Sequence, residues 1–275
     1  MKRVSILVAA SFSSVLAWIG SAAAEEAARP PGLTLPAGKL NVMVNLEVEM
    51  SADRVAKPLA LSPDVAYGVT PDLTVALVHS KFGLTGFRAA AGGGLCVTGT
   101  DGGCARVYNN VGGEAWYNVA RGQLAAAVGG GVHATSFEAG FVDAKLGARL
   151  RWTAGKVALS ASPSVELALT KRDDGAGNRL NKDRLWLPVL AMYKATPALQ
   201  VGAGTGLKAP LTGFADAYQI PLGVTATYAF DPATSVGAAW VFGAVVGGAT
   251  NPPAPAPGVK GLDVRGLQVW GSRTF

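Results

Sequence analysis

The sequence contains few of the residues from which catalytic, redox and metal sites are usually built. Its 275 residues include two histidines and two cysteines. The chain therefore has too few residues of these two types for a metal site that combines several cysteine and histidine ligands. The two cysteines are too far apart for a CxxC motif, and no histidine is near them in the sequence. We therefore expect no metal site and no cofactor.

Charge is scarce as well. Charged residues make up 15% of the chain and hydrophobic residues 49%, whereas about 25% of a typical soluble protein is charged. After residue 24, no apolar run is long enough for a membrane helix, because the run at 235–249 is short and rich in glycine. The net charge of +6 is mild, and no basic run is interleaved with aromatic residues. Nucleic-acid binding is therefore not expected.

The N-terminus has the three parts of a secretory signal peptide. Two basic residues precede an apolar stretch at 4–19, and small residues follow up to Ala24, directly before two acids. This pattern predicts cleavage between Ala24 and Glu25; the alternative is an uncleaved membrane anchor. No cysteine follows the site, so a lipoprotein is not expected. Residues 1–24 would be the signal peptide and residues 25–38 a short periplasmic segment, and losing two basic residues would lower the charge from +6 to +4.

The remaining chain alternates apolar and other residues with a period of two. Between Leu40 and Met50 every second residue is apolar, and the residues between them include Asn45, Glu47 and Glu49. A strand with one apolar and one polar face produces this pattern, whereas a helix would turn the acids to every side. The pattern recurs in about twelve segments of about 10 residues, enough to cross an apolar band near 25 Å when tilted. The predicted strands are 39–50, 58–69, 72–80, 111–120, 123–133, 141–152, 156–169, 184–194, 198–208, 218–230, 234–246 and 262–275.

The connections between the predicted strands alternate between short and long. Short ones lie at 70–72, 120–122, 153–155, 195–197 and 231–233, and longer ones at 81–110, 171–183 and 247–261. Barrels of the bacterial outer membrane have short periplasmic turns and longer extracellular loops. With the N-terminus in the periplasm, all the short turns lie on that side. The sequence therefore predicts an all-β fold, a transmembrane antiparallel up-and-down β-barrel of about 12 strands over residues 39–275.

A soluble sandwich or a lipocalin-like barrel is the alternative fold. There the apolar face of each strand would point inward, and the polar face would meet water. The polar faces in this sequence are rich in Gly, Ala and Ser, which suits a crowded barrel interior. Aromatic residues near the strand ends match the belt that barrels place at the membrane interface. They are Tyr67, Trp152, Tyr193, Tyr228 and Phe230.

The signal peptide, one hairpin and the last strand together carry a family resemblance. The hairpin reads Tyr-Gly-Val-Thr-Pro-Asp-Leu-Thr-Val at 67–75, and the last strand ends Val-Trp-Gly-Ser-Arg-Thr-Phe at 269–275. The chain resembles Gram-negative outer-membrane β-barrel proteins of the small porin-like or transporter-like kind, without a motif for a named subfamily. This implies a place in the cell outer membrane, the lipid bilayer as a partner, and recognition of the strand ending at Phe275 by the barrel assembly machinery. Arg273 stands where an apolar or aromatic residue is expected, so the register of the last strand is left open.

If the apolar face meets lipid, the other face lines the lumen. The residues predicted there are Asn41, Asn45, Glu47, Glu49, Asp64, Glu114, Trp116, Asn118, His133, Asp143, Lys145, Arg149, Arg151, Glu166, Arg184 and Lys208. We interpret them as a narrow channel with a transverse field that passes ions or small solutes; the near balance of signs argues against strong ion selectivity. The alternative is a filled interior in which these groups pair with one another. About eight strands make a filled barrel and about sixteen an aqueous channel, so twelve is compatible with both.

Cys96 and Cys104 flank a glycine-rich turn in the longest predicted loop, residues 81–110. In an exported protein such a pair indicates a disulfide that constrains the loop; the alternative is a metal or redox pair. The loop either folds inward to constrict the pore or projects outward to bind a partner. The outward course leaves a structural or adhesion barrel as an alternative function.

An outer-membrane lipid hydrolase is the enzymatic alternative. Such an enzyme needs a histidine close to a serine, with a third polar residue that orients the histidine. We expect His79 to face lipid or the membrane interface and His133 to face the lumen, and neither belongs to a His-x-Ser motif. The glycine-rich run at 202–206 lacks the GxGxxG spacing of a nucleotide loop. We therefore predict a protein that is not an enzyme.

Overall fold

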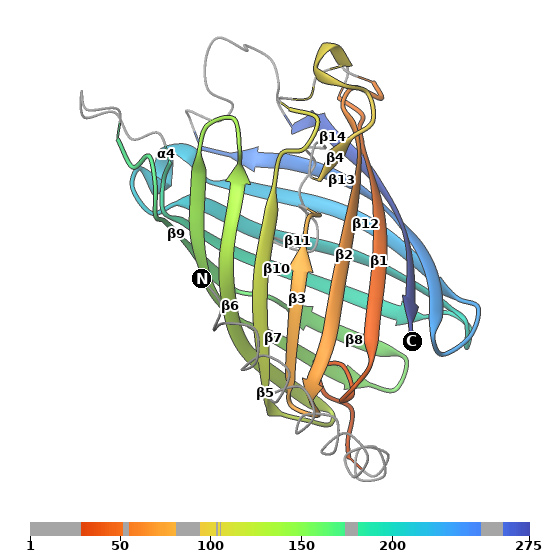
Figure 1. Cartoon of the computed structure of the whole chain (residues 1–275). Helices are drawn as coiled ribbons and strands as arrows, with labels where there is room; N and C mark the ends of the chain where they lie inside the picture. Colours follow the sequence, from red (N-terminus) through yellow and green to blue (C-terminus); the bar gives the residue numbers. More distant parts are fainter. Residues whose placement is uncertain are drawn as a thin grey trace, which may run out of the picture.

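The computed structural model in Figure 1 describes residues 29–51, 55–80, 94–102, 104, 106–173, 181–248 and 261–275. The predicted cleavage site between Ala24 and Glu25 lies outside the described residues. Within the described part of the chain, no helix is long and apolar enough to span a membrane. Most of the regular structure is β-strand.

Twelve antiparallel crossings form one closed barrel (Figure 1). They are β1 (Leu40–Glu49), β2 (Leu59–Thr70), β3 (Leu73–Val78), β5 (Val111–Ala120), β6 (Leu124–Ser136), β7 (Phe141–Ala154), β8 (Val157–Ala161) with β9 (Ser164–Ala168), β10 (Arg184–Lys194), β11 (Leu199–Pro210), β12 (Gln219–Ala229), β13 (Thr234–Gly247) and β14 (Gly261–Thr274). Neighbours in the chain pair with one another, and β1 also pairs with β14, which closes the ring. The predicted all-β antiparallel barrel of about twelve strands is confirmed.

The seam between β1 and β14 is a regular antiparallel ladder of nine residue pairs. Phe275 extends it, since its N–H donates to the Leu40 carbonyl at 2.8 Å. The sequence left the register of the last strand open because of Arg273. In the structure Arg273 lies opposite Val42. Its guanidinium carbon is 5.4 Å from the centre of the Phe275 ring. The last strand is therefore paired up to its final residue, and Arg273 lies at the end of the barrel.

The strand predicted at 156–169 is interrupted once, between β8 and β9. Pro163 has no N–H to contribute to the ladder, and neither has Pro188 on the neighbouring strand β10. Hydrogen bonds to the two proline carbonyls keep the wall continuous. The Ser162 N–H donates to Pro188 at 3.1 Å, and the Ala148 N–H donates to Pro163 at 2.9 Å. The strands β8 and β9 are thus two halves of one crossing.

The described part of the longest loop extends the barrel wall. Strand β3 ends at Val78, and beyond this end the short strand β4 (Leu95–Cys96) takes its place beside β2. There β4 pairs with Ala60 and Leu61. Residues 95 and 96 therefore extend the wall beside β2. The inward or outward course of the whole loop stays a prediction, because residues 81–93 lie outside the described residues.

The disulfide between Cys96 and Cys104 is present, and its Cα atoms are 6.2 Å apart. It closes the turn that contains the short helix η1 (Thr100–Gly102). The Thr98 hydroxyl donates to the Gly102 carbonyl at 3.2 Å within the same turn. The predicted disulfide is confirmed, and while it is formed the two sulfur atoms are not available as thiolate ligands of a metal.

The outside of the barrel is apolar and its inside is polar, the reverse of a soluble protein. Leu124 and Leu146 on the outer face are each 61% exposed, whereas Glu47 and Asp143 inside the barrel are each 1% exposed. The aromatic residues predicted for the interfacial belt are exposed too, namely Tyr67, Trp152, Tyr193, Tyr228 and Phe230. An apolar surface of this extent suits lipid and not water. The arrangement excludes the lipocalin-like alternative.

The two ends of the barrel differ. At one end, which we call the short-turn end, tight turns join β2 to β3, β5 to β6, β7 to β8, β10 to β11 and β12 to β13. At the other, the long-loop end, most connections are longer and one contains the short helix α4 (Phe214–Ala217); the connection at 137–140, between β6 and β7, is as short as the turns of the first end. The chain enters β1 and leaves β14 at the short-turn end.

A closed barrel predicts that the folded protein resists unfolding by SDS until it is heated, because no strand has a free edge in the ring. Unheated protein extracted from membranes should therefore migrate differently from boiled protein in gel electrophoresis. The variant Cys96→Ala/Cys104→Ala leaves every barrel strand intact and should show the same shift. Identical migration of heated and unheated samples would contradict the closed ring.

Candidate functional site in the barrel lumen

The structure places the predicted lumen residues on the inner face of the barrel. Those buried are Asn45, Glu47, Glu49, Asp64, Glu114, Trp116, Asn118, His133, Asp143, Lys145 and Glu166. Those partly buried are Asn41, Arg149, Arg151, Arg184 and Lys208. Their role in passing a solute stays a prediction, because burial reports position and not conduction.

Glu114 on β5 is the centre of one ionic cluster. Its carboxylate accepts hydrogen bonds from Lys145 Nζ at 3.0 Å and Arg149 Nη2 at 3.2 Å, both on β7, and from Trp116 Nε1 at 2.7 Å. The ring nitrogen Nε2 of His133 lies 3.3 Å from the same carboxylate. The Arg149 guanidinium also lies 3.9 Å from the centre of the Trp116 ring, a cation–π contact. These partners replace the water that the buried Glu114 carboxylate gives up.

Glycines on β6 explain how these residues meet across the sheet. Gly131 lies between Glu114 and Lys145 in the register. Because it has no side chain, the carboxylate and the ammonium can reach one another over it. The Trp116 ring lies in the same way over Gly129, where a Cβ atom would come within 2.9 Å of the ring. The clusters therefore depend on small residues as much as on charged ones.

A second ionic cluster joins β7, β9 and β10. The Arg184 guanidinium bridges two carboxylates, that of Asp143 at 2.8 Å and that of Glu166 at 3.0 Å. Asn181 Nδ2 and the Thr135 hydroxyl donate to Asp143 at 2.6 and 2.8 Å. Since Asn181 precedes β10, the connection at the long-loop end is tied to the inner wall here.

Acidic residues on β1 and β2 face these clusters from across the lumen. Glu47, Glu49 and Asp64 are buried there, and Asp64 accepts hydrogen bonds from the backbone N–H groups of His79 and Ser80 at 2.7 and 2.9 Å. Counted from β1 around the ring, β7 is the fifth strand in one direction and β10 the fifth in the other. The carboxylates of β1 and β2 therefore lie opposite the basic residues of β7 and β10.

On the side of β7 and β10, carboxylates lie behind guanidinium groups. The side chains of Glu114 and Asp143 are at most 1% exposed, whereas those of Arg149 and Arg184 are 34% and 24% exposed. The acids thus hold the arginines in place from the wall side. The guanidinium groups are therefore the better exposed charges on this side of the lumen.

The strands from β10 to β13 contribute an apolar part of the inner face. Leu190 on β10 and Val241 on β13 lie in one row of the register, with Gly204 and Gly223 between them. Leu190 packs against the buried pair of Ala239 and Val241, which the two glycines make possible. The lumen is therefore polar on one side and partly apolar on the other.

The expectation that His79 faces lipid or the membrane interface stays a prediction. His79 directly follows the end of β3 at Val78, and its side chain is buried. Its Nε2 lies 2.8 Å from the Tyr108 hydroxyl, and its Nδ1 contacts the Pro63 carbonyl. The Tyr108 side chain is itself 42% exposed, and its ring centre lies 5.7 Å from that of His79. The His79 ring is therefore held in a structural contact at the long-loop end.

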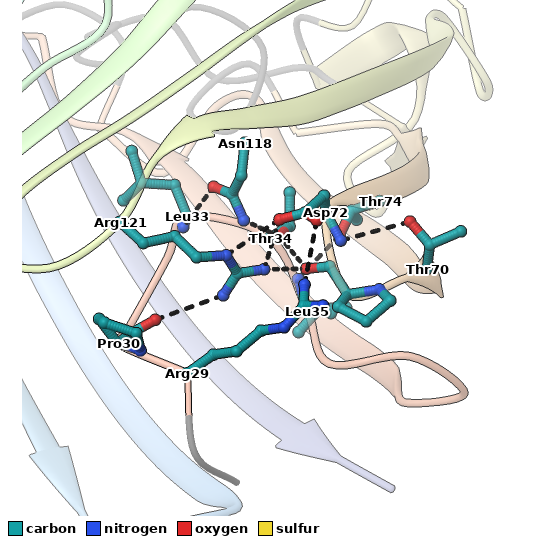
Figure 2. A network of polar contacts seen from close by, with 11 residues as sticks. Arg29, Pro30, Leu33, Thr34, Leu35, Thr70, Asp72, Thr74, Asn118 and Arg121 are labelled. Carbon is teal, nitrogen blue, oxygen red and sulfur yellow. Dashed lines mark hydrogen bonds and ion pairs between the residues drawn. The ribbon is translucent and has the colours of Figure 1, made fainter. Parts of the chain in front are cut away.

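Residues 29–38, which we call the strap, lie against the inner wall at the short-turn end (Figure 2). The Leu33 N–H donates to Asn118 Oδ1 at 2.8 Å, and the Leu35 N–H donates to the Thr74 hydroxyl at 2.8 Å. Asn118 and Thr74 are buried on the inner face, so the strap lies on the lumen side of this mouth. The sequence predicts only a periplasmic segment at 25–38, because the prolines and glycines of this stretch show no period-two alternation.

No protein-family model matches the chain, and no curated protein matches it. Among solved structures, the fold is similar to that of the NanC porin, with 12% sequence identity, a TM-score of 0.59, and coverage of 84% of this chain and 98% of that one. It is also similar to the KdgM porin, with 9% identity, a TM-score of 0.53, and coverage of 86% and 99%. At these identities the likeness shows a shared fold. The chain thus has the closed barrel fold of these porins, consistent with a Gram-negative outer-membrane barrel.

Removing the centre of the first ionic cluster should destabilise the barrel. Glu114→Ala leaves Lys145 and Arg149 without their buried counter-charge, and we expect a loss of about 3 kcal/mol in the free energy of unfolding. Urea unfolding of the protein folded in detergent measures this loss. Glu138→Ala, at an exposed residue in the β6–β7 connection, is the control and should leave stability unchanged. Equal stability of the two variants would show that the cluster does not hold the wall.

Proposed function

We propose that the protein is a narrow porin-like channel through which ions or small solutes diffuse passively across the outer membrane. The observation that supports this most directly is the pair of opposed charged walls inside a closed barrel. A protein whose lumen served only as filling would need no charge there, because burying ion pairs is at best neutral for stability. Facing charges of opposite sign produce a field across the path and keep that path attractive to water and polar solutes.

The charge pattern favours weak ion selectivity. Six carboxylates and five basic groups lie among the predicted lumen residues, so the two signs nearly cancel. The arginines are better exposed than the acids behind them, as the values for Arg149 and Arg184 show. We expect a small preference for anions along the wall of β7 and β10. The identity of the solute would depend on size and polarity more than on net charge.

The proposed location follows from the apolar outer face together with the predicted signal peptide. The short-turn end would face the periplasm and the long-loop end the outside of the cell. Phe275 is 57% exposed and paired to the start of β1. In this proposal the barrel assembly machinery recognises the last strand through that residue. The lipid bilayer is then the partner of the whole outer face.

A structural or adhesion barrel is the second candidate. The burial of Glu47, Glu114 and Asp143 to 4% exposure or less favours it, because side chains fill the lumen around these groups. The disulfide-closed turn between Cys96 and Cys104 would then serve as an outward contact surface. A lipid hydrolase is the weaker alternative, since both ring nitrogens of His79 have structural partners. Conduction separates the channel from both other candidates.

Purified folded protein should conduct ions in planar lipid bilayers, with a small preference for anions. Arg149→Gln should shift the reversal potential in a salt gradient towards cations, because it removes a partly exposed positive charge from the lumen. Arg273→Gln removes the same charge from an exposed position at the end of the barrel, and its reversal potential should equal that of the wild type. Reproducible silence of the folded protein would favour the structural candidate instead.

A further inference from the structure

The strap is attached to successive strands at the short-turn mouth. The Gly38 N–H donates to the Gly68 carbonyl on β2 at 2.8 Å. The hydrogen bonds to β3 and β5 shown in Figure 2 follow. At Gly32, the Arg151 side chain reaches the strap from β7, and its Nη2 donates to the Gly32 carbonyl at 3.1 Å. The strap therefore takes up space on the lumen side of the mouth from β2 to β5.

The composition of the strap suits a segment that docks as a stiff, extended piece. Pro30, Pro31 and Pro36 have no N–H to satisfy and a fixed φ, which reduces the entropy lost on docking. The free carbonyls are used instead. The Pro31 carbonyl accepts from the Gly122 N–H at 3.0 Å, and the Pro30 carbonyl accepts from Arg121 Nη1 at 3.4 Å. Each attachment is a separate hydrogen bond worth about 1 kcal/mol, unlike the continuous ladders of the barrel.

Asp72 holds the outer end of the strap by charge. Its carboxylate accepts from Arg29 Nη1 of the strap at 3.2 Å and from Arg121 Nε at 2.9 Å (Figure 2). The Asp72 and Arg29 side chains are about one-third exposed, so water and salt weaken the pair. This end of the strap is therefore held by an ion pair that salt can weaken.

We infer that the strap is a gate at the short-turn mouth, which narrows the lumen while it is docked and widens it when the Asp72 contact is released. This inference rests on the proposed channel function. A docked strap gives a low conductance and a released strap a higher one, so single channels switch between two levels.

A designed disulfide tests the docked state. A Cβ atom built on Gly32 would lie 3.0 Å from Asn118 Cγ, close to the place of a cysteine sulfur at residue 118, and this spacing suits a disulfide. In a Cys96→Ala/Cys104→Ala background, the oxidised pair Gly32→Cys/Asn118→Cys should show only the low level in planar bilayers. A reducing agent should restore switching. Switching that persists in the oxidised protein would overturn the gate.

Deletion of residues 30–37 tests the released state. It keeps Gly38 and all barrel strands, and removal of a segment that occupies the lumen side of the mouth should raise the conductance and abolish the low level. If the wild type and the deletion variant conduct equally, the inference that the strap is a gate is wrong, whereas the proposed channel function is supported. If the wild type is silent and the deletion conducts, the strap closes the mouth completely, which supports the gate. If both are silent, the channel function fails, and labelling decides whether the strap occupies the mouth.

The labelling measurement does not depend on conduction. In the background without native cysteines, a charged maleimide added from the short-turn side should fail to label Asn118→Cys while the strap is present, and should label it after deletion of 30–37. Adding Asp72→Asn should speed the labelling. Adding Asp231→Asn should not, because Asp231 caps its own turn through the N–H groups of Ala233 and Thr234. Equal labelling with and without the strap would overturn the inference.

Discussion

In a lipid environment every backbone N–H and C=O group must find a partner on a neighbouring strand, and the rest of this molecule depends on that requirement. It forces the first and last strands together, so the seam of β1 and β14 is paired up to Phe275. The wall meets this requirement even at its prolines. Pro163 and Pro188 cannot donate, and at that point their carbonyls accept the bonds that hold the wall together.

In a closed barrel, every second residue of each strand points into a confined interior. The small residues there determine where the large side chains can fit. Glu114 reaches Lys145 because Gly131 stands between them, and Trp116 lies over Gly129. Charges in this space have little water, so each carboxylate gathers donors. The resulting clusters keep acids against the wall and leave guanidinium groups towards the lumen, which is the basis of the proposed function.

The strap is held by a different kind of contact from the strands of the barrel wall. The wall is a continuous ladder, in which opening one bond strains its neighbours. The strap is held by separate hydrogen bonds to residues such as Thr74 and Asn118 and by the partly hydrated ion pairs of Asp72. Contacts of this kind break one at a time and cost little each. The continuous wall and the strap that we propose as a gate therefore meet at the same mouth.

The sequence by itself determined the number of strands, their boundaries within a few residues, and the face to which residues such as Glu47 and Leu146 turn. Period-two alternation is a local property, so it can be read without knowing the fold. Only the tertiary structure decided which charges meet, because Glu114 and Lys145 are far apart in the chain and become neighbours through register. It also decided the contact of His79 with Tyr108 and the docking of residues 29–38. Neither follows from an alternation, and both depend on partners that folding brings within reach.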